Sequence, residues 1–305
     1  MPNLDDPNAF PAKMMTRQFQ ALKEYISGKN IEDDLRRAVQ QNRFRRCATY
    51  NRNETEKWLT NGWNTEKILE MSNFLFDDPA NTFAIQWAFP QAYYSCYCIS
   101  LAFFKTAGFT EDRHSTVIKK IGCLIEEGKY PDFLSFYANG GMYQISQSGV
   151  SRSPGGSTVE YIPGDEDSMQ NQISQFLNAT RQKDLRTKKE DVKKYTVKRE
   201  RKKCFNREDW ELVSDKLGPT NILSLLYRKR IKFNYDSIAS VFSGDLDASA
   251  IYNSLQFLVS KINLVHEAFI CKILGNSEYD RIIQSNARPE FVSERLETIR
   301  NRIIV

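Results

Sequence analysis

Apolar residues recur along most of the chain at spacings of three and four, which is the period of an amphipathic α-helix. The longest regular seam lies in the stretch 248–274. Its apolar positions, at successive spacings of 4, 3, 4, 3, 4 and 4, are Ile251, Leu255, Leu258, Ile262, Val265, Phe269 and Ile273. Asp245 or Asp247 is suited to cap the start of this helix. The pattern therefore predicts one long helix with a continuous buried side.

The most apolar stretch of the chain is Pro90–Lys120. Within Ala92–Phe104 nearly every residue is apolar, aromatic or small, which is typical of a helix buried on most sides. Gly108 is predicted to end this helix, and Thr110 is predicted to cap the next one. We expect this pair of helices to form the centre of a helical bundle.

Weaker periodic patterns predict further helices at 13–27, 31–49, 53–61, 65–76, 221–230 and 288–300, and 121–127 is expected to continue the second central helix. A loop rich in Ser, Gly and Pro is expected at 146–168, with a short strand at 158–162. No internal repeat is visible, and almost no strand is expected. The chain is therefore predicted to be an all-α protein with an irregular insertion.

The composition is ordinary for a soluble globular protein, with 305 residues, 41% of them hydrophobic and 27% charged. No apolar run approaches the roughly 18–20 residues that span a bilayer. The first ten residues have neither a basic start nor an apolar core, so no secretory signal or membrane association is expected. The six cysteines lack metal-type spacing, and Cys96 and Cys98 would point to different faces of a helix. We expect a cytoplasmic protein with reduced thiols, no metal site and no other cofactor.

The net charge of +5 is unevenly distributed. The stretch 181–203 carries twelve Lys or Arg against four Asp or Glu, a local balance of +8 that leaves about −3 for the rest of the chain. Its basic residues are Arg181, Lys183, Arg186, Lys188, Lys189, Lys193, Lys194, Lys198, Arg199, Arg201, Lys202 and Lys203. Such a segment suits sequence-independent contacts with nucleic-acid phosphates, and we favour RNA over DNA. A docking arm for an acidic protein surface is the alternative.

Two separated stretches resemble the pattern of small stand-alone prokaryotic HEPN proteins. The first contains Ala92-Tyr93-Tyr94, Gly108 and His114-Ser115-Thr116-Val117-Ile118. The second contains Leu226-Tyr227-Arg228-Lys229-Arg230, Asn234-Tyr235-Asp236 and the helix that follows from Ala248. The resemblance implies an antiparallel four-helix core with extra N-terminal helices.

The domain organisation that this resemblance implies has five parts. Residues 1–80 would form an N-terminal helical region and residues 276–305 a C-terminal helix. The core would be split into 81–132 and 216–275 by a basic insertion at 133–215.

Many HEPN proteins are metal-independent ribonucleases whose motif has an arginine and a histidine separated by four to six intervening residues. RNA cleavage can use the strand's own 2′-hydroxyl, so such a site needs a general acid or base and a cation for the phosphorane. No arginine stands at this spacing before His114. With four residues between them, Arg230 is followed by Tyr235 in place of histidine, and before His266 the arginine position is taken by Lys261, which lacks the guanidinium fork. The family's motif is therefore degenerate in this chain.

Each candidate also has a structural interpretation. His266 adjoins the apolar seam and suits a packed histidine, while His114 stands in the first turn of a helix and can serve a local hydrogen bond. The cations at 228–230 can cover a helix end. A composite site of His114 with Arg230 requires that their two helices pack together, as in HEPN cores.

The first functional hypothesis is a HEPN-like nucleic-acid-associated protein with a degenerate catalytic motif and a binding or scaffolding role. The resemblance implies a component of a prokaryotic toxin–antitoxin or anti-phage system, acting as a homodimer or as a subunit of a larger complex. The second hypothesis is a metal-independent endoribonuclease that uses His114 or His266 with Arg230 or Lys261. A third is a structural subunit whose insertion docks a larger enzyme.

Overall fold

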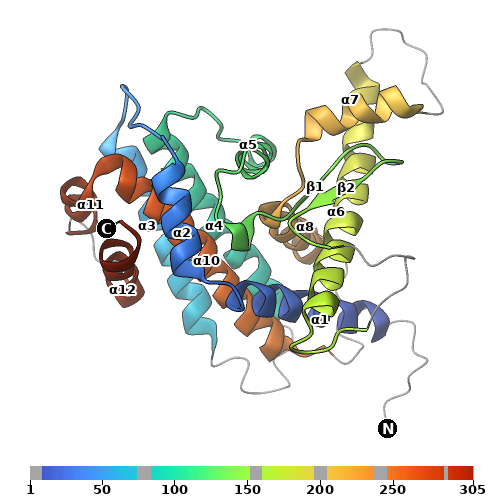
Figure 1. The fold of residues 1–305 in the computed structure, drawn as a ribbon, viewed down its shortest axis with the longest axis horizontal. Helices are drawn as coiled ribbons and strands as arrows, with labels where there is room; N and C mark the ends of the chain where they lie inside the picture. The colour runs from blue at the N-terminus through green and yellow to red at the C-terminus, as the bar shows by residue number, and fades with distance from the viewer. Residues whose placement is uncertain are drawn as a thin grey trace.

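The computed structural model describes residues 9–73, 84–151, 160–195, 205–235, 246–284 and 288–304. Its helices in chain order are α1 (Ala9–Ser27), α2 (Ile31–Gln41), α3 (Arg52–Met71), α4 (Ile85–Ala107), α5 (His114–Glu126), α6 (Glu166–Tyr195), α7 (Arg207–Leu217), α8 (Ile222–Tyr235), α10 (Ala248–Leu274), α11 (Asn276–Gln284) and α12 (Glu290–Thr298) (Figure 1). A 3₁₀ turn at Asp132–Leu134 precedes the antiparallel strands β1 (Tyr137–Asn139) and β2 (Ser146–Ser148), and a π-helical turn at Ile299–Ile303 follows α12. The described chain is thus predominantly helical, as its apolar periodicity predicted.

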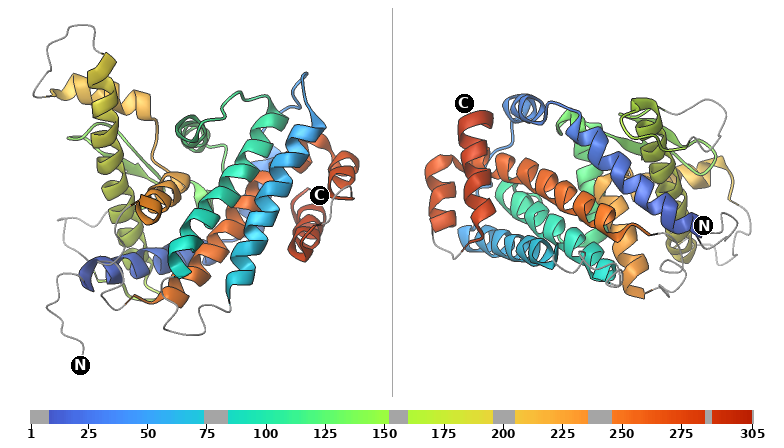
Figure 2. Two further views of the ribbon diagram at one scale, coloured as in Figure 1. Left: turned by 180° about the vertical axis from the view of Figure 1, so that it is seen from behind. Right: turned by 90° about the horizontal axis from the view of Figure 1, so that it is seen from below.

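Helix α4 is the central element of the fold. It contacts α3, α5, α8 and α10, and nearly all of its residues are buried. Seen from behind, α3, α4 and α10 lie side by side (Figure 2). The helix begins five residues before Pro90, and Gly108 ends it in the left-handed conformation with φ 82°. The predicted end at Gly108 is therefore confirmed.

Close approach of α3 to α4 depends on Gly62. A Cβ atom at this position would lie 2.4 Å from Cδ1 of Ile99, so a larger residue would separate the two helices. The short distance also lets the hydroxyl of Ser95 donate a hydrogen bond of 3.0 Å to the carbonyl of Gly62.

Helix α10 matches the prediction from its apolar seam. It spans Ala248–Leu274, and the side chain of Asp247 accepts a hydrogen bond from the amide of Ala250. The seam residues are buried against α4 and α1, with the exception of Ile273 at the C-terminal end, which is partly exposed. Of the two caps predicted from the sequence, Asp245 and Asp247, it is Asp247 that caps the helix.

A buried ionic cluster fastens α12 to α3 and α10. Arg295 of α12 donates hydrogen bonds to Glu66 of α3 and to Glu267 of α10, and all three side chains are less than 10% exposed. Trp63 Nε1 and the Tyr279 hydroxyl also donate to Glu267, at 3.2 and 2.9 Å. Two carboxylates therefore share one guanidinium in the interior.

The elements at 133–195 are more regular than the sequence suggested. Helix α6 is 30 residues long, and its N-terminal half contributes Ile173, Phe176 and Leu177 to the main core beside α1 and α8. In Figure 1, α6 stands on the opposite side of the molecule from α3, with α5 and α8 between them. Part of the predicted insertion is thus packed core.

Several predicted boundaries were wrong. The stretch 31–49 is helical only to Gln41, and 53–71 is one helix rather than two. Helix α5 begins at His114 after Arg113, and Thr110 does not cap it. The strand predicted at 158–162 is not present at 160–162, and its first two residues lie outside the described part of the chain. The strands instead lie on either side of a Gly140-Gly141 turn.

Candidate functional site

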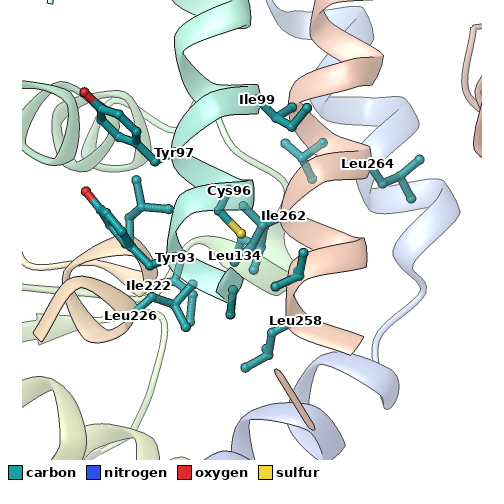
Figure 3. Packing of buried hydrophobic residues seen from close by; sticks show 14 of the residues in the cluster. Tyr93, Cys96, Tyr97, Ile99, Leu134, Ile222, Leu226, Leu258, Ile262 and Leu264 are labelled. Atoms are coloured by element: carbon teal, nitrogen blue, oxygen red, sulfur yellow. The ribbon is translucent and has the colours of Figure 1, made fainter. Parts of the chain in front are cut away.

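Helices α4, α5 and α8 together build a small site of tyrosine, histidine and arginine side chains. Helix α4 has two different sides at this level (Figure 3). Cys96 and Ile99 face α10, whereas Tyr93 and Tyr97 point their hydroxyl groups away from it. The two tyrosines are four residues apart, so they project from the same face of the helix.

His114, the first residue of α5, lies against these tyrosines. Its Nδ1 atom is 2.9 Å from the hydroxyl oxygen of Tyr93, and its ring centroid is 4.2 Å from that of Tyr97. The Tyr97 hydroxyl donates to the carbonyl of Asp112, which holds the segment just before α5 against α4. The histidine is partly exposed and is therefore accessible from solvent.

Arg230 of α8 completes the site. Its guanidinium carbon lies 4.8 Å from the ring centroid of Tyr94, 5.5 Å from that of Tyr227 and 5.6 Å from that of Tyr93. These distances are those of cation–π contacts. Tyr227 also lies beside His114, with ring centroids 5.8 Å apart. The arginine is only 8% exposed.

The guanidinium of Arg230 has no anionic partner in the described part of the chain. No ion pair to Asp or Glu is formed there, and the buried Nε–H has no hydrogen-bond acceptor. A buried charge is normally paired, because desolvation penalises it strongly. The rings of three tyrosines offset part of that penalty, and an anion bound beside the guanidinium would offset more of it.

The hydrogen bond from Tyr93 determines the chemistry of His114. Tyr93 is fully buried, and burial raises the pKa of its hydroxyl well above 10, so it stays protonated. Among the described residues its hydroxyl has no acceptor other than Nδ1 of His114. Tyr93 therefore donates to Nδ1, and the remaining proton of the neutral imidazole is on Nε2.

Both burial and the nearby charge keep His114 neutral. Burial, followed by the positive charge of Arg230, lowers its pKa below 6.5. Burial also raises the pKa of Tyr97 to about 12. At pH 7 the site thus presents one guanidinium, one imidazole Nε2–H donor and the protonated hydroxyls of Tyr93 and Tyr97. The guanidinium and the imidazole N–H are groups that can donate to an oxyanion.

The structure brings together two of the five residues predicted as catalytic candidates. His114 and Arg230 form the composite site described above. Tyr235 is the last residue of α8, and its side chain lies outside the described part. His266 and Lys261 are elsewhere, on α10.

His266 lies in the core, which agrees with the packed histidine of the sequence interpretation, and its catalytic role stays an untested prediction. It is 1% exposed, the hydroxyl of Tyr130 lies 2.7 Å from its Nε2, and that of Ser100 lies 3.5 Å from its Nδ1. Burial lowers its pKa to about 3. Lys261 instead places its ammonium 5.4 Å from the ring centroid of Phe257.

Arg181 was wrongly predicted as a nucleic-acid contact. It is fully buried and donates to the carbonyls of Gly140 and Gly218 and, at 2.6 Å, to the hydroxyl of Ser214. These bonds join the turn after β1 to the end of α7. Arg181 is therefore a structural residue.

The other basic residues of 181–203 differ in exposure. Lys183 and Arg186 are exposed on α6. Lys188 pairs with Asp191 at 3.4 Å, and the Lys189 ammonium lies 4.7 Å from the ring centroid of Phe205. The side chains of Lys193 and Lys194 and the whole of Lys198, Arg199, Arg201, Lys202 and Lys203 lie outside the described part.

The described ranges contain neither a metal-binding cluster nor a membrane-spanning helix. In the ranges that the structure describes, no three His, Cys, Asp or Glu side chains gather in a way that could hold a metal ion. Within the same ranges, no helix combines the length and the apolar character needed to cross a membrane.

The sequence interpretation did not identify the tyrosines as parts of the site. Tyr93, Tyr94 and Tyr227 entered only as landmarks of the HEPN resemblance, and Tyr97 was not singled out. A usable signal was the spacing of four between Tyr93 and Tyr97 in an otherwise apolar helix, and of three between Tyr227 and Arg230.

Comparisons with models of protein families, with curated proteins and with solved structures found no match to this chain.

Proposed function

We propose that this protein binds single-stranded RNA and holds one phosphate of the strand between Arg230 and His114. The observation that carries the proposal is the guanidinium of Arg230, which is buried among three tyrosine rings without an anionic partner in the described chain. A phosphate oxygen would accept from this guanidinium and from Nε2–H of His114. The site would then have a charge-assisted pair of the kind that fixes a strand in register.

Single-stranded RNA is preferred because of the aromatic surroundings. Tyr94 and Tyr227 are partly exposed next to the arginine. Unstacked bases bind on aromatic faces of this kind, and stacking is worth about 1–3 kcal/mol per base. The exposed Lys183 and Arg186 on α6 would add long-range attraction for the strand.

The wider setting is proposed from the resemblance. Helices α4, α5, α8 and α10 would correspond to the four helices of a HEPN core. The protein would then be a nucleic-acid-associated component of a prokaryotic toxin–antitoxin or anti-phage system, acting as a homodimer or within a larger complex.

Metal-independent RNA cleavage is the second candidate, and the proximity of His114 to Arg230 favours it. In that reaction the 2′-oxygen would attack the adjacent phosphorus, His114 would accept the hydroxyl proton, and the 5′-oxygen would leave and take a proton from water. Arg230 would stabilise the charged phosphorane. The step needs an unprotonated Nε2, however, whereas the donor Tyr93 favours the tautomer with a proton there. Binding is therefore the better supported of the two functions.

Fluorescence anisotropy with a labelled single-stranded RNA tests the binding proposal. Arg230→Met should weaken binding by about tenfold or more, because it removes a charge-assisted contact worth roughly 1.5–3 kcal/mol. Lys232→Met is the matched control, since it removes the same charge from the other side of α8. Equal losses in the two variants would show that only net charge matters and would overturn the proposed site.

The same RNA, incubated with a chelator, separates binding from cleavage. Cleavage by the wild-type protein that His114→Asn abolishes, with binding retained, would establish the ribonuclease. If the wild-type protein binds the strand but leaves it intact, the binding role stands alone.

A further inference from the structure

A cavity adjoins the proposed phosphate site. It has a volume of 310 Å³ and lies between α5, α6, α8 and the segment that leads from α7 to α8. Ligand pockets in proteins have volumes of about 300–1,000 Å³, so this one is at the small end of the range. Its lining includes Ser115, which directly follows His114, and Tyr227.

Tyr227 is shared by the cavity and the phosphate site. It lines the cavity, and its ring also lies beside His114 and Arg230. A nucleotide whose phosphate is bound at Arg230 could therefore place its base in the cavity, next to an aromatic ring. The cavity would be a subsite of the same strand, and this inference rests on the function proposed above.

Asp184 of α6 is one of two carboxylates that line the cavity, and the other is Asp191. Asp184 is partly buried and makes no ion pair or hydrogen bond within the described residues. Burial raises its pKa to about 7, against the opposing charges of Arg228, Arg181 and Lys183. Both arginines are used elsewhere, since Arg228 donates to Thr180 at 3.0 Å and Arg181 donates to backbone carbonyls. The carboxyl group is thus available to a ligand.

Of the two carboxylates that line the cavity, Asp191 pairs with Lys188, and Asp184 makes no such pair among the described residues. Lys119 is held by the carbonyl of Asp215 at 2.6 Å. Lys216 is exposed at the edge. These cations suit a ligand that also carries phosphate, as a nucleotide does.

We infer that this cavity receives a guanine base, recognised by Asp184 and stacked against Tyr227. The Watson–Crick edge of guanine presents two adjacent donors, N1–H and the N2 amino group, which match the two oxygens of a carboxylate. Adenine and cytosine present an amino group beside an acceptor nitrogen, and uracil presents one N–H between two carbonyls. Only guanine can therefore donate to both oxygens of Asp184 at once when this group is in its carboxylate form, which predominates above its pKa of about 7, so the test is run at pH 8.

The test compares strands that differ in one base. Anisotropy is measured with oligouridine strands containing a single G, A or C, and calorimetry is measured with guanosine and adenosine 5′-monophosphates. The wild-type protein should prefer the G strand and GMP by about tenfold, as expected for a bidentate base contact. Asp184→Asn should abolish that preference and leave the affinity for oligouridine within about twofold, because the phosphate site is unchanged.

Asp191→Asn is the matched control, since it removes the same charge from the same helix and the same cavity wall. Thermal unfolding of both variants checks that they are folded.

RNA binding without a base preference, or a preference that Asp184→Asn retains, would overturn the guanine site while the phosphate site stands. Binding of GMP that depends on Asp184, without RNA binding, would retain the cavity as a nucleotide site and contradict the proposed function. If neither RNA nor GMP binds, both proposals are wrong.

Discussion

The hydroxyl of Tyr93 lies 2.9 Å from Nδ1 of His114, and this contact joins the centre of α4 to the first residue of α5. Because the tyrosine is buried and stays protonated, it acts as the donor and leaves the proton of the neutral imidazole on Nε2. The histidine is thereby prepared to donate to an anion rather than to accept a proton from a substrate. The hydrogen bond from Tyr93 thus favours RNA binding at His114 over RNA cleavage.

Nitrogen NMR of the imidazole rings can measure this arrangement, since the chain contains only two histidines. We expect His114 to carry its proton on Nε2 and to titrate below pH 6.5, because burial and Arg230 both disfavour the charged ring. Tyr93→Phe should convert it to a mixture of tautomers, since the phenyl ring keeps the packing and removes the donor. Arg230→Met should raise its pKa towards 6.5.

Tyr50→Phe, which removes a hydroxyl outside this site, near Arg52 and Glu278, is the control and should change neither property. If the wild-type ring carries its proton on Nδ1, the assignment of donor and acceptor is reversed and the ribonuclease becomes the favoured function.

His266 should make the fold sensitive to acid. Its pKa is about 3 in the folded protein against about 6.5 in the unfolded chain, so below pH 6.5 the unfolded chain binds the proton and the folded protein does not. Its contribution to stability is therefore fully present above pH 6.5 and is lost as the pH falls towards 3. At pH 4.5 the loss from this group should be about 2–3 kcal/mol in the free energy of unfolding.

Urea unfolding at pH 7 and pH 4.5 measures this difference. His266→Gln, which retains a polar partner for Tyr130, should lose less stability between the two pH values than the wild-type protein loses. His114→Asn should reduce the acid loss by a smaller amount, because His114 is only partly buried. An equal acid loss in the wild type and in His266→Gln would contradict the prediction.

The sequence could predict the elements that depend on local patterns, and it could not predict those that depend on contacts between distant parts of the chain. Helix α10 was predicted with its limits and with Asp247 as a possible cap, because its seam and its cap are local patterns. The start of α5 was predicted three residues too early, since Thr110 has the chemistry of a cap but tertiary contacts hold the preceding segment on α4. Local propensity decided the first case and packing decided the second.

The functional site shows the same dependence on long-range packing. Arg230 and His114 are 116 residues apart in the sequence, so only the packing of α8 against α4 and α5 brings them together. Arg181 looked like one of twelve solvated cations, yet the carbonyls that bury it come from two distant turns. No local pattern distinguishes it from exposed Lys183, because exposure depends on the neighbouring elements.

Arg295 should be essential for stability because it neutralises two buried carboxylates. Arg295→Met should reduce the free energy of unfolding by about 3–5 kcal/mol, since Glu66 and Glu267 would remain buried without their cation. Arg302→Met, which breaks the exposed pair with Glu32, should cost less than about 1 kcal/mol. Urea unfolding measures both effects.

A triple variant distinguishes the charge from the packing. Adding Glu66→Gln and Glu267→Gln to Arg295→Met removes the unpaired carboxylates and should recover part of the lost stability. If the triple variant is less stable than Arg295→Met alone, the loss comes from packing and the electrostatic explanation is wrong.

Gly122 should control the distance between α5 and the start of α8. A Cβ atom there would lie 2.4 Å from the carbonyl oxygen of Pro219, which is backbone and cannot rotate away. Gly122→Ala should therefore cost about 1–3 kcal/mol and shift His114 relative to Arg230. RNA affinity should fall in protein that remains folded.

Gly28→Ala is the control for this change, because the nearest atom to its Cβ would be 3.4 Å away, an ordinary contact. Thermal unfolding and anisotropy are measured on both variants. Unchanged RNA affinity in a destabilised Gly122→Ala protein would show that the phosphate site does not depend on the position of α5.

The basic residues of α6 should fall into two groups, one that stabilises the fold and one that binds RNA. Arg181→Met should reduce the free energy of unfolding by about 2–4 kcal/mol, because it leaves the carbonyls of Gly140 and Gly218 without their donor in the interior. RNA affinity per folded molecule should be unchanged.

Lys183→Gln and Arg186→Gln should show the opposite result, with stability within about 0.5 kcal/mol of the wild type, since both side chains are exposed. Each should lower the slope of log affinity against log salt by about 0.7 if it contacts a phosphate of a single strand. An unchanged slope in the double variant would restrict the contacts of α6 to its residues beyond Arg186, and a weaker affinity in folded Arg181→Met would show that the buried arginine positions the strand after all.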